Sequence, residues 1–68
     1  MKVKELIGHS FLTKGQYITV VDRTNGIEYS SENIGRYDFG KNQETVLKMK
    51  VNSFRPTEYG IHIDAEAR

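Results

Sequence analysis

The chain has 68 residues, with ten Lys and Arg against nine Asp and Glu, so its formal net charge at pH 7 is +1. A nearly neutral chain lacks the strong positive field of a general polyanion binder. Without cysteine it has no disulfide framework, and His9 and His62 alone are too few for a structural zinc site, so no metal or cofactor is expected.

A short helix is the first predicted element. Apolar residues near the amino terminus recur at spacings of three and four, which places them on one side of a helix that Gly8 ends. These residues are Val3, Leu6, Ile7 and Phe11. An alternating strand over residues 1–5 is the competing interpretation, but two adjacent apolar residues at positions 6 and 7 break a period of two.

A β-hairpin over residues 17–31 is predicted next, because two alternating apolar stretches flank Asn25-Gly26. Asn-Gly adopts the positive φ angles of a type I′ turn at low cost. A two-residue turn would place Arg23 opposite Glu28, whereas a three-residue loop would oppose two carboxylates. We therefore favour the two-residue register.

The segment from Ser31 to Thr45 has no clean period and is interpreted as a connection that crosses the sheet. One interpretation places Tyr37 and Phe39 in the core. The other makes an exposed cluster of Arg36, Tyr37 and Phe39 an anchor for a binding partner.

A second hairpin is predicted from the period of two that begins at Thr45 and from the alternation of residues 61–64. Pro56 is expected to stop its first strand. A turn centred on Thr57 would pair Val51 with Ile63 and Lys50 with Asp64, giving the hairpin one dry and one charged face.

These elements predict a single α+β domain over residues 1–68, with a short amino-terminal helix packed on a four-stranded antiparallel sheet made of two β-hairpins. Such a chain buries only about 60% of its unfolded surface. A homodimer that covers an edge or a face of the sheet is therefore expected.

No catalytic motif is present: the chain has no cysteine nucleophile, no GxSxG elbow and no phosphate-binding loop. His62 and Asp64 lie two residues apart on one strand face, but the flat face of a sheet does not form a catalytic cleft. We expect a protein that is not an enzyme. It also lacks an apolar stretch of about 18 residues and the apolar core of a signal peptide, which favours the cytoplasm.

The order VKELI, VVDRTNG, IEY, LKMKVNSF and IHID resembles small uncharacterised proteins encoded by phages and prophages of Gram-positive bacteria, over about residues 2–64. Lys48 and Lys50 depart from the acidic third strand of those proteins. The resemblance implies a protein-binding module in the bacterial host cytosol. A stoichiometric inhibitor of a host defence system, such as an anti-CRISPR or other anti-defence protein, is the form it suggests.

Two functional hypotheses follow. In the first, the partner is a host protein or complex, and the contact residues are Arg36, Tyr37, Phe39, Lys41, Lys48, Lys50 and His62. In the alternative, the face formed by Lys48, Lys50 and His62 binds nucleic acid or a nucleotide. Acidic neighbours on the same strands oppose the alternative.

Overall fold

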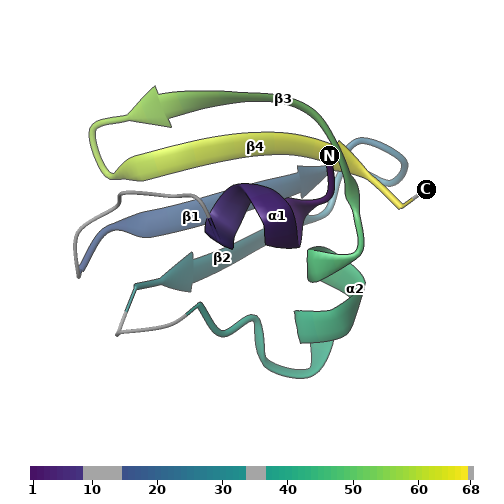
Figure 1. Ribbon diagram of the computed structural model, residues 1–68, viewed down its shortest axis with the longest axis horizontal. Coiled ribbons are helices and arrows are strands. Elements are labelled where there is room, and N and C mark those ends of the chain that lie inside the picture. The colour runs from purple at the N-terminus through teal and green to yellow at the C-terminus, as the bar shows by residue number, and fades with distance from the viewer. Residues whose placement is uncertain (9–14, 34–36, 68) are drawn as a thin grey trace.

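The computed structural model describes residues 1–8, 15–33 and 37–67. Its elements are α1 (Val3–Gly8), β1 (Tyr17–Asp22), β2 (Glu28–Glu32), the 3-10 helix η1 (Gly40–Asn42), α2 (Gln43–Leu47), β3 (Lys50–Thr57) and β4 (Gly60–Glu66). The four strands form one open sheet, and α1 lies across one of its faces (Figure 1). The predicted α+β class is therefore confirmed.

The amino-terminal helix is confirmed over Val3–Gly8, and the residues that follow Gly8 lie outside the described part of the chain. Val3 is fully buried, and Leu6 and Ile7 pack against the core from the same side of the helix. Phe11, the fourth residue of the predicted stripe, lies outside the described residues, as does His9. The spacing of three and four thus identified the buried side of α1.

The predicted all-antiparallel sheet is wrong, because the sheet is mixed. The strand order is β2-β1-β4-β3, and the central pair, β1 and β4, is parallel. The connection through η1 and α2 carries the chain from the β2 edge to the β3 edge, so β4 returns beside β1 in the same direction (Figure 1). Turn signals specify only the pairing of neighbouring strands, so the sequence did not reveal this contact.

The register predicted for β1 and β2 is wrong by two residues. Val21, rather than Arg23, lies opposite Glu28, and Val20 lies opposite Tyr29. A shift of two residues leaves each side chain on its predicted face, because strand side chains alternate with a period of two. The predicted division of β1 into a buried and an exposed face is therefore correct.

Side-chain hydrogen bonds explain why the turn is longer than predicted, with Asp22 rather than Thr24 bonded to Ile27. The Asp22 carboxylate accepts a bond from the N–H of Thr24 at 2.8 Å, and the Asn25 amide oxygen accepts one from the N–H of Ile27 at 2.9 Å. Such bonds give Asp and Asn an alternative to the backbone ladder. Gly26, with φ of +75°, closes the loop by donating to the Asp22 carbonyl oxygen at 2.7 Å.

The second hairpin also differs from its prediction. Its first strand begins at Lys50 and continues through Pro56, which lies opposite Ile61, and Thr57 pairs with Gly60 across the turn. Because β3 is an edge strand, a proline whose nitrogen faces outward costs no ladder bond. The register also differs from the prediction, because Val51 opposes Ala65 rather than Ile63, and the pairing is irregular between Val51 and Ser53.

Residues 45–47, predicted as the start of that strand, belong to α2. Val46 and Met49 are almost completely buried, and they lie three residues apart, as the buried side of a helical turn requires. Together with Val3, Ile18, Val20, Phe39, Ile63 and Ala65 they form the hydrophobic core on the helical side of the sheet. The opposite side, which we call the open face, is covered by neither α1 nor α2.

Candidate binding surfaces

The predicted anchor cluster in the middle segment is not a continuous exposed surface. Phe39 is only 8% exposed and belongs to the core, and Tyr37 packs against that core. Lys41 is exposed in η1, and Arg36 lies outside the described residues. Phe39 is therefore corrected from a surface anchor to a core residue, as the first interpretation of this segment proposed.

Polar side chains hold Phe39 in this position. The Gln43 amide oxygen accepts a hydrogen bond from the Phe39 N–H at 2.7 Å, while the amide nitrogen donates to the Tyr37 carbonyl at 3.0 Å. The buried hydroxyl of Ser31 accepts a bond from the N–H of Asp38 at 2.7 Å. These bonds fasten the connection to β2 and to α2 and direct Phe39 inward.

The predicted strip of Lys48, Lys50 and His62 is also divided. Lys48 follows α2, where its ammonium lies 3.5 Å from the Glu44 carboxylate. Lys50 starts β3, and His62 belongs to β4 and lies opposite Arg55. Only Lys50 and His62 share the open face, at different positions along the strands, so no single basic strip contains all three.

His62 and Asp64 share one face, as the sequence predicted. The imidazole Nε2 lies 3.6 Å from an Asp64 carboxylate oxygen, and the Arg23 guanidinium lies 3.9 Å from the same oxygen. The Ser53 hydroxyl donates to the other carboxylate oxygen at 3.3 Å. The Asp64 carboxylate is therefore contacted by three polar neighbours, which makes this group a polar cluster on the surface of the sheet.

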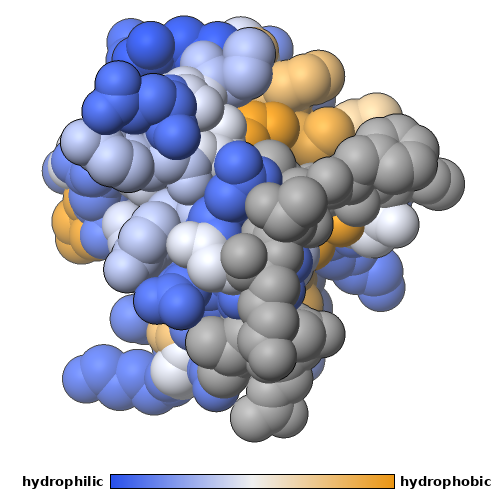
Figure 2. All heavy atoms as spheres, turned by 90° about the vertical axis from the view of Figure 1, so that its left-hand side faces the viewer, coloured by the Kyte–Doolittle hydropathy of each residue, from blue (hydrophilic) through white to orange (hydrophobic). Residues whose placement is uncertain are grey.

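An exposed apolar surface at the β3–β4 turn was not predicted. We call it the Phe54 patch, and it consists of Phe54, Pro56, Tyr59 and Ile61. Phe54 is 54% exposed and Tyr59 is 68% exposed, while Ile61 is half-buried. Figure 2 views the end of the sheet that holds this turn and shows apolar atoms gathered at its upper right.

Strand pairing explains why the Phe54 patch is exposed. Phe54 lies opposite the buried Ile63, and Pro56 lies opposite Ile61, so both belong to the helical side of the sheet. They occupy the edge strand, and the core that α1 and α2 build does not enclose them. The patch was not predicted because Pro56 was expected to end β3. An edge strand tolerates proline, so the alternation of faces continues through residue 56.

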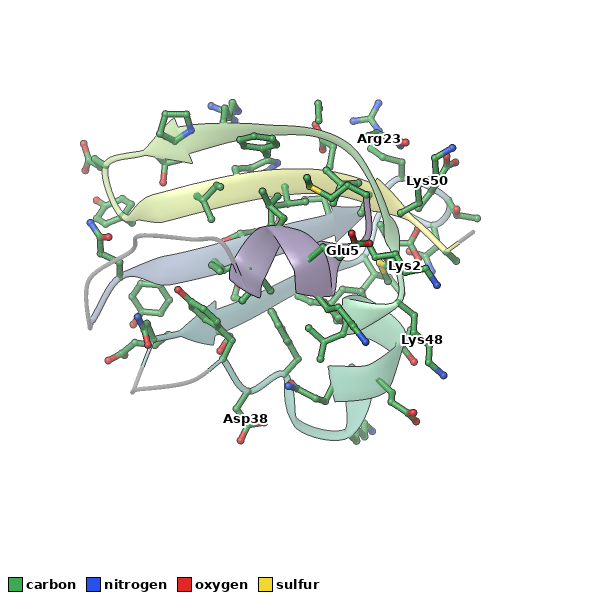
Figure 3. All side chains as sticks on the ribbon, in the orientation of Figure 1. Lys2, Glu5, Arg23, Asp38, Lys48 and Lys50 are labelled. Atoms are coloured by element: carbon green, nitrogen blue, oxygen red, sulfur yellow. The ribbon has the colours of Figure 1, made fainter. Side chains whose placement is uncertain are left out.

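A second unpredicted feature joins two lysines. Lys2 forms an isolated antiparallel bridge with Lys50, flanked by bonds from the Val3 N–H to the Met49 carbonyl at 2.9 Å and from the Val51 N–H to the Met1 carbonyl at 2.8 Å. This pattern is that of a non-hydrogen-bonded pair, in which opposing side chains are closest. Figure 3 shows Lys2, Lys48 and Lys50 at the same end of the molecule.

At the other end of the open face, Tyr17 donates its phenolic hydrogen to the Glu32 carboxylate at 3.2 Å. This hydrogen bond, together with the negative charge of Glu32, raises the pKa of Tyr17 above its usual value. Tyr17 is 45% exposed, so the pair is a surface contact between neighbouring strands.

Within the described ranges, no helix is long and apolar enough to cross a membrane, and no group of three His, Asp or Glu side chains is placed to hold a metal ion. Comparisons of the chain with protein-family models, with curated proteins and with solved structures find no match. Its own residues therefore supply the support for a function.

Proposed function

We propose that this chain is a non-enzymatic protein-binding module and that the Phe54 patch is its contact surface. The exposure of Phe54 is the observation that carries the proposal. An aromatic side chain loses favourable burial when it stays in water, and full burial of one Phe stabilises by about 1.5–3 kcal/mol. Contiguous apolar side chains on a small protein, edged by polar residues, are typical of a protein interface.

The composition of the patch also supports a protein partner. Interface hot spots are enriched in aromatic residues, and Tyr59 adds an exposed amphipathic ring at the turn that follows β3. Pro56 contributes a rigid apolar surface with no N–H that would require a partner. The polar side chains of Arg55 and Thr57 alternate with these residues but project to the open face.

The resemblance to small phage-encoded proteins indicates the kind of partner that we propose. An inhibitor that acts by occlusion needs only a surface that binds its target, and the exposed Phe54 patch is the surface that we propose for this role. We therefore propose a host protein or complex in the bacterial cytosol as the partner. Inhibition of a defence system is the part of the proposal that rests on the resemblance alone.

Site-specific photocrosslinking tests the proposed surface. A benzophenone amino acid is introduced at Phe54 and, as a matched control, at Ile27, which is 49% exposed and lies beside the β1–β2 turn. After irradiation in host-cell extract, we expect a discrete crosslinked species from position 54 alone. Excess unlabelled wild type should suppress it, whereas a Phe54→Ser/Tyr59→Ser variant should not. The same products from both positions would refute the assignment.

Binding of nucleic acid is the second candidate, and the Lys2–Lys50 bridge favours it. Like charges directly opposite each other are unfavourable, and an anion placed between them would relieve the repulsion. This hypothesis predicts retention of an oligonucleotide at low salt, a steep loss of affinity with added salt, and a large loss in Lys50→Glu. No retention of DNA or RNA at low salt would eliminate it.

A further inference from the structure

The open face separates its charges between its two edges. Cross-strand pairing places the following residues on this face: Tyr17, Thr19, Val21, Glu28, Ser30, Glu32, Lys50, Ser53, Arg55, Thr57, His62, Asp64 and Glu66. The β2 edge carries Glu28 and Glu32, both exposed, whereas the β3 edge carries Lys50 and Arg55, also exposed. One edge is therefore acidic and the opposite edge is basic.

The middle of this face does not disturb that separation. Thr19 and Ser30 lie side by side with their hydroxyl oxygens 3.5 Å apart. The negative charge of Asp64 lies 3.9 Å from the positive charge of Arg23. Glu66 of β4 lies opposite Lys50 of β3. Lys2 pairs with Lys50 from the other side, so a second lysine lies at the β3 edge beside it.

We propose that the open face binds the open face of a second copy of this chain, about a two-fold axis that runs along the strands. Such an axis places β2 of each copy over β3 of the other, so each acidic edge meets a basic edge. An axis across the strands would instead place acidic on acidic and basic on basic. Two-fold symmetry requires a self-complementary surface, and this charge pattern supplies one.

The register of the sheet supports this arrangement in detail. Glu28 lies opposite Val21, Val21 beside Asp64, and Asp64 opposite Ser53. An axis along the strands preserves position along them, so Glu28 would face Ser53 of the second copy, between its Lys50 and Arg55. Stacked sheets lie about 10 Å apart, a distance that long basic side chains can span.

Pairing through the sheet edges is a poorer alternative. If β2 of two copies paired antiparallel with Ser30 opposite Ser30, Glu28 of each copy would lie opposite Glu32 of the other. Like charges directly opposite each other are unfavourable. On the β3 edge, Pro56 lacks an N–H, the strand is irregular after Val51, and the Lys2 bridge occupies its start. These are features by which natural proteins prevent edge association.

The size of the face indicates a weak, salt-dependent dimer. The face is four strands wide, at about 4.8 Å per strand, and some five residues long, at about 3.3 Å per residue. Its area is therefore small and lies at the low end of the range for transient complexes. The Phe54 patch lies on the other side of the sheet, so both patches would stay exposed in the dimer. The proposed association is therefore independent of the proposed protein-binding surface.

Charge exchange between the edges tests the proposal. Sedimentation equilibrium at low salt should show self-association of the wild type that weakens at least tenfold in 0.5 M NaCl. A Glu28→Lys/Glu32→Lys variant and a Lys50→Glu/Arg55→Glu variant should each be monomeric, because like charges would then meet. Mixed in equal amounts, the two variants should form a heterodimer at least as stable as the wild-type dimer.

A Lys41→Glu/Lys48→Glu variant is the matched control, since it changes the net charge as much as the Lys50 and Arg55 changes do but lies off the open face. It should associate as the wild type does. The proposal is overturned if the wild type is monomeric at millimolar concentration and low salt. It is also overturned if the two folded variants fail to associate when mixed, or if an oligonucleotide occupies the basic edge of a monomer.

Discussion

Replacement of Gly60 by alanine should disrupt the parallel pairing of β1 with β4, which was not predicted from the sequence. Gly60 has φ of +149°, and a Cβ built on it would lie 1.8 Å from the Tyr17 carbonyl oxygen and 2.8 Å from the Tyr17 carbonyl carbon. These are backbone atoms, so no side-chain rotation can relieve the overlap. The strands must separate.

The expected cost combines two effects. Backbone strain at an unfavourable φ costs about 1–3 kcal/mol. Separation of the strands weakens the 2.7 Å bond from the Tyr17 N–H to the Tyr59 carbonyl, a further cost of about 0.5–1.5 kcal/mol. A domain of this size has a total stability of roughly 3–10 kcal/mol. Gly60→Ala should therefore remove a large fraction of it.

Urea unfolding followed by far-ultraviolet circular dichroism measures this cost. Gly26→Ala is the control, because Gly26 has φ of +75° but nothing within 4 Å of the added Cβ. Its cost should be limited to backbone strain, about 1–2 kcal/mol. Equal costs for the two variants would refute the conclusion that Gly60 is required by the close approach of β1.

Three further predictions concern the core, the connection and the surface. Phe39→Ala should lower the free energy of unfolding by about 3–5 kcal/mol and Phe54→Ala by much less, since only Phe39 is buried; equal losses in urea unfolding would contradict this. Ser31→Ala should cost about 1–3 kcal/mol by the same assay, because the Asp38 N–H loses its partner. Glu32→Gln should lower the pKa of Tyr17 towards 10 in a ¹³C NMR titration. In the wild type, stability that this pair contributes is present below pH 10 and is lost as the pH rises through the raised pKa.

The faces of β1, β2 and β4 were predictable because alternation survives an error in register, whereas Ser53 of β3 was assigned to the apolar side and lies opposite Asp64 on the open face. Val20 and Ile63 were assigned to the interior from a period of two, and both are completely buried. The turn length was wrong, yet a shift of two residues moves no side chain to the other face. The helical stripe of Val3, Leu6 and Ile7 was equally robust.

The features that were not predicted depend on contacts distant in sequence. The parallel pairing of β1 with β4 follows from the path of the whole chain between the two sheet edges. The burial of Phe39 depends on hydrogen bonds that Phe39 and Tyr37 form with the Gln43 side chain, and the local pattern did not indicate them. Pro56 was judged by its usual effect on a central strand, whereas its strand lies at an edge.

The central claim, that the Phe54 patch is the binding surface, is tested most directly by mapping the contact on the protein itself. The protein captured by crosslinking at Phe54 is purified and added, unlabelled, to the ¹⁵N-labelled chain, and amide chemical shifts are recorded. We predict the largest shift changes at Phe54, Tyr59 and Ile61. Changes confined to the segment from Tyr37 to Lys41 would contradict the claim.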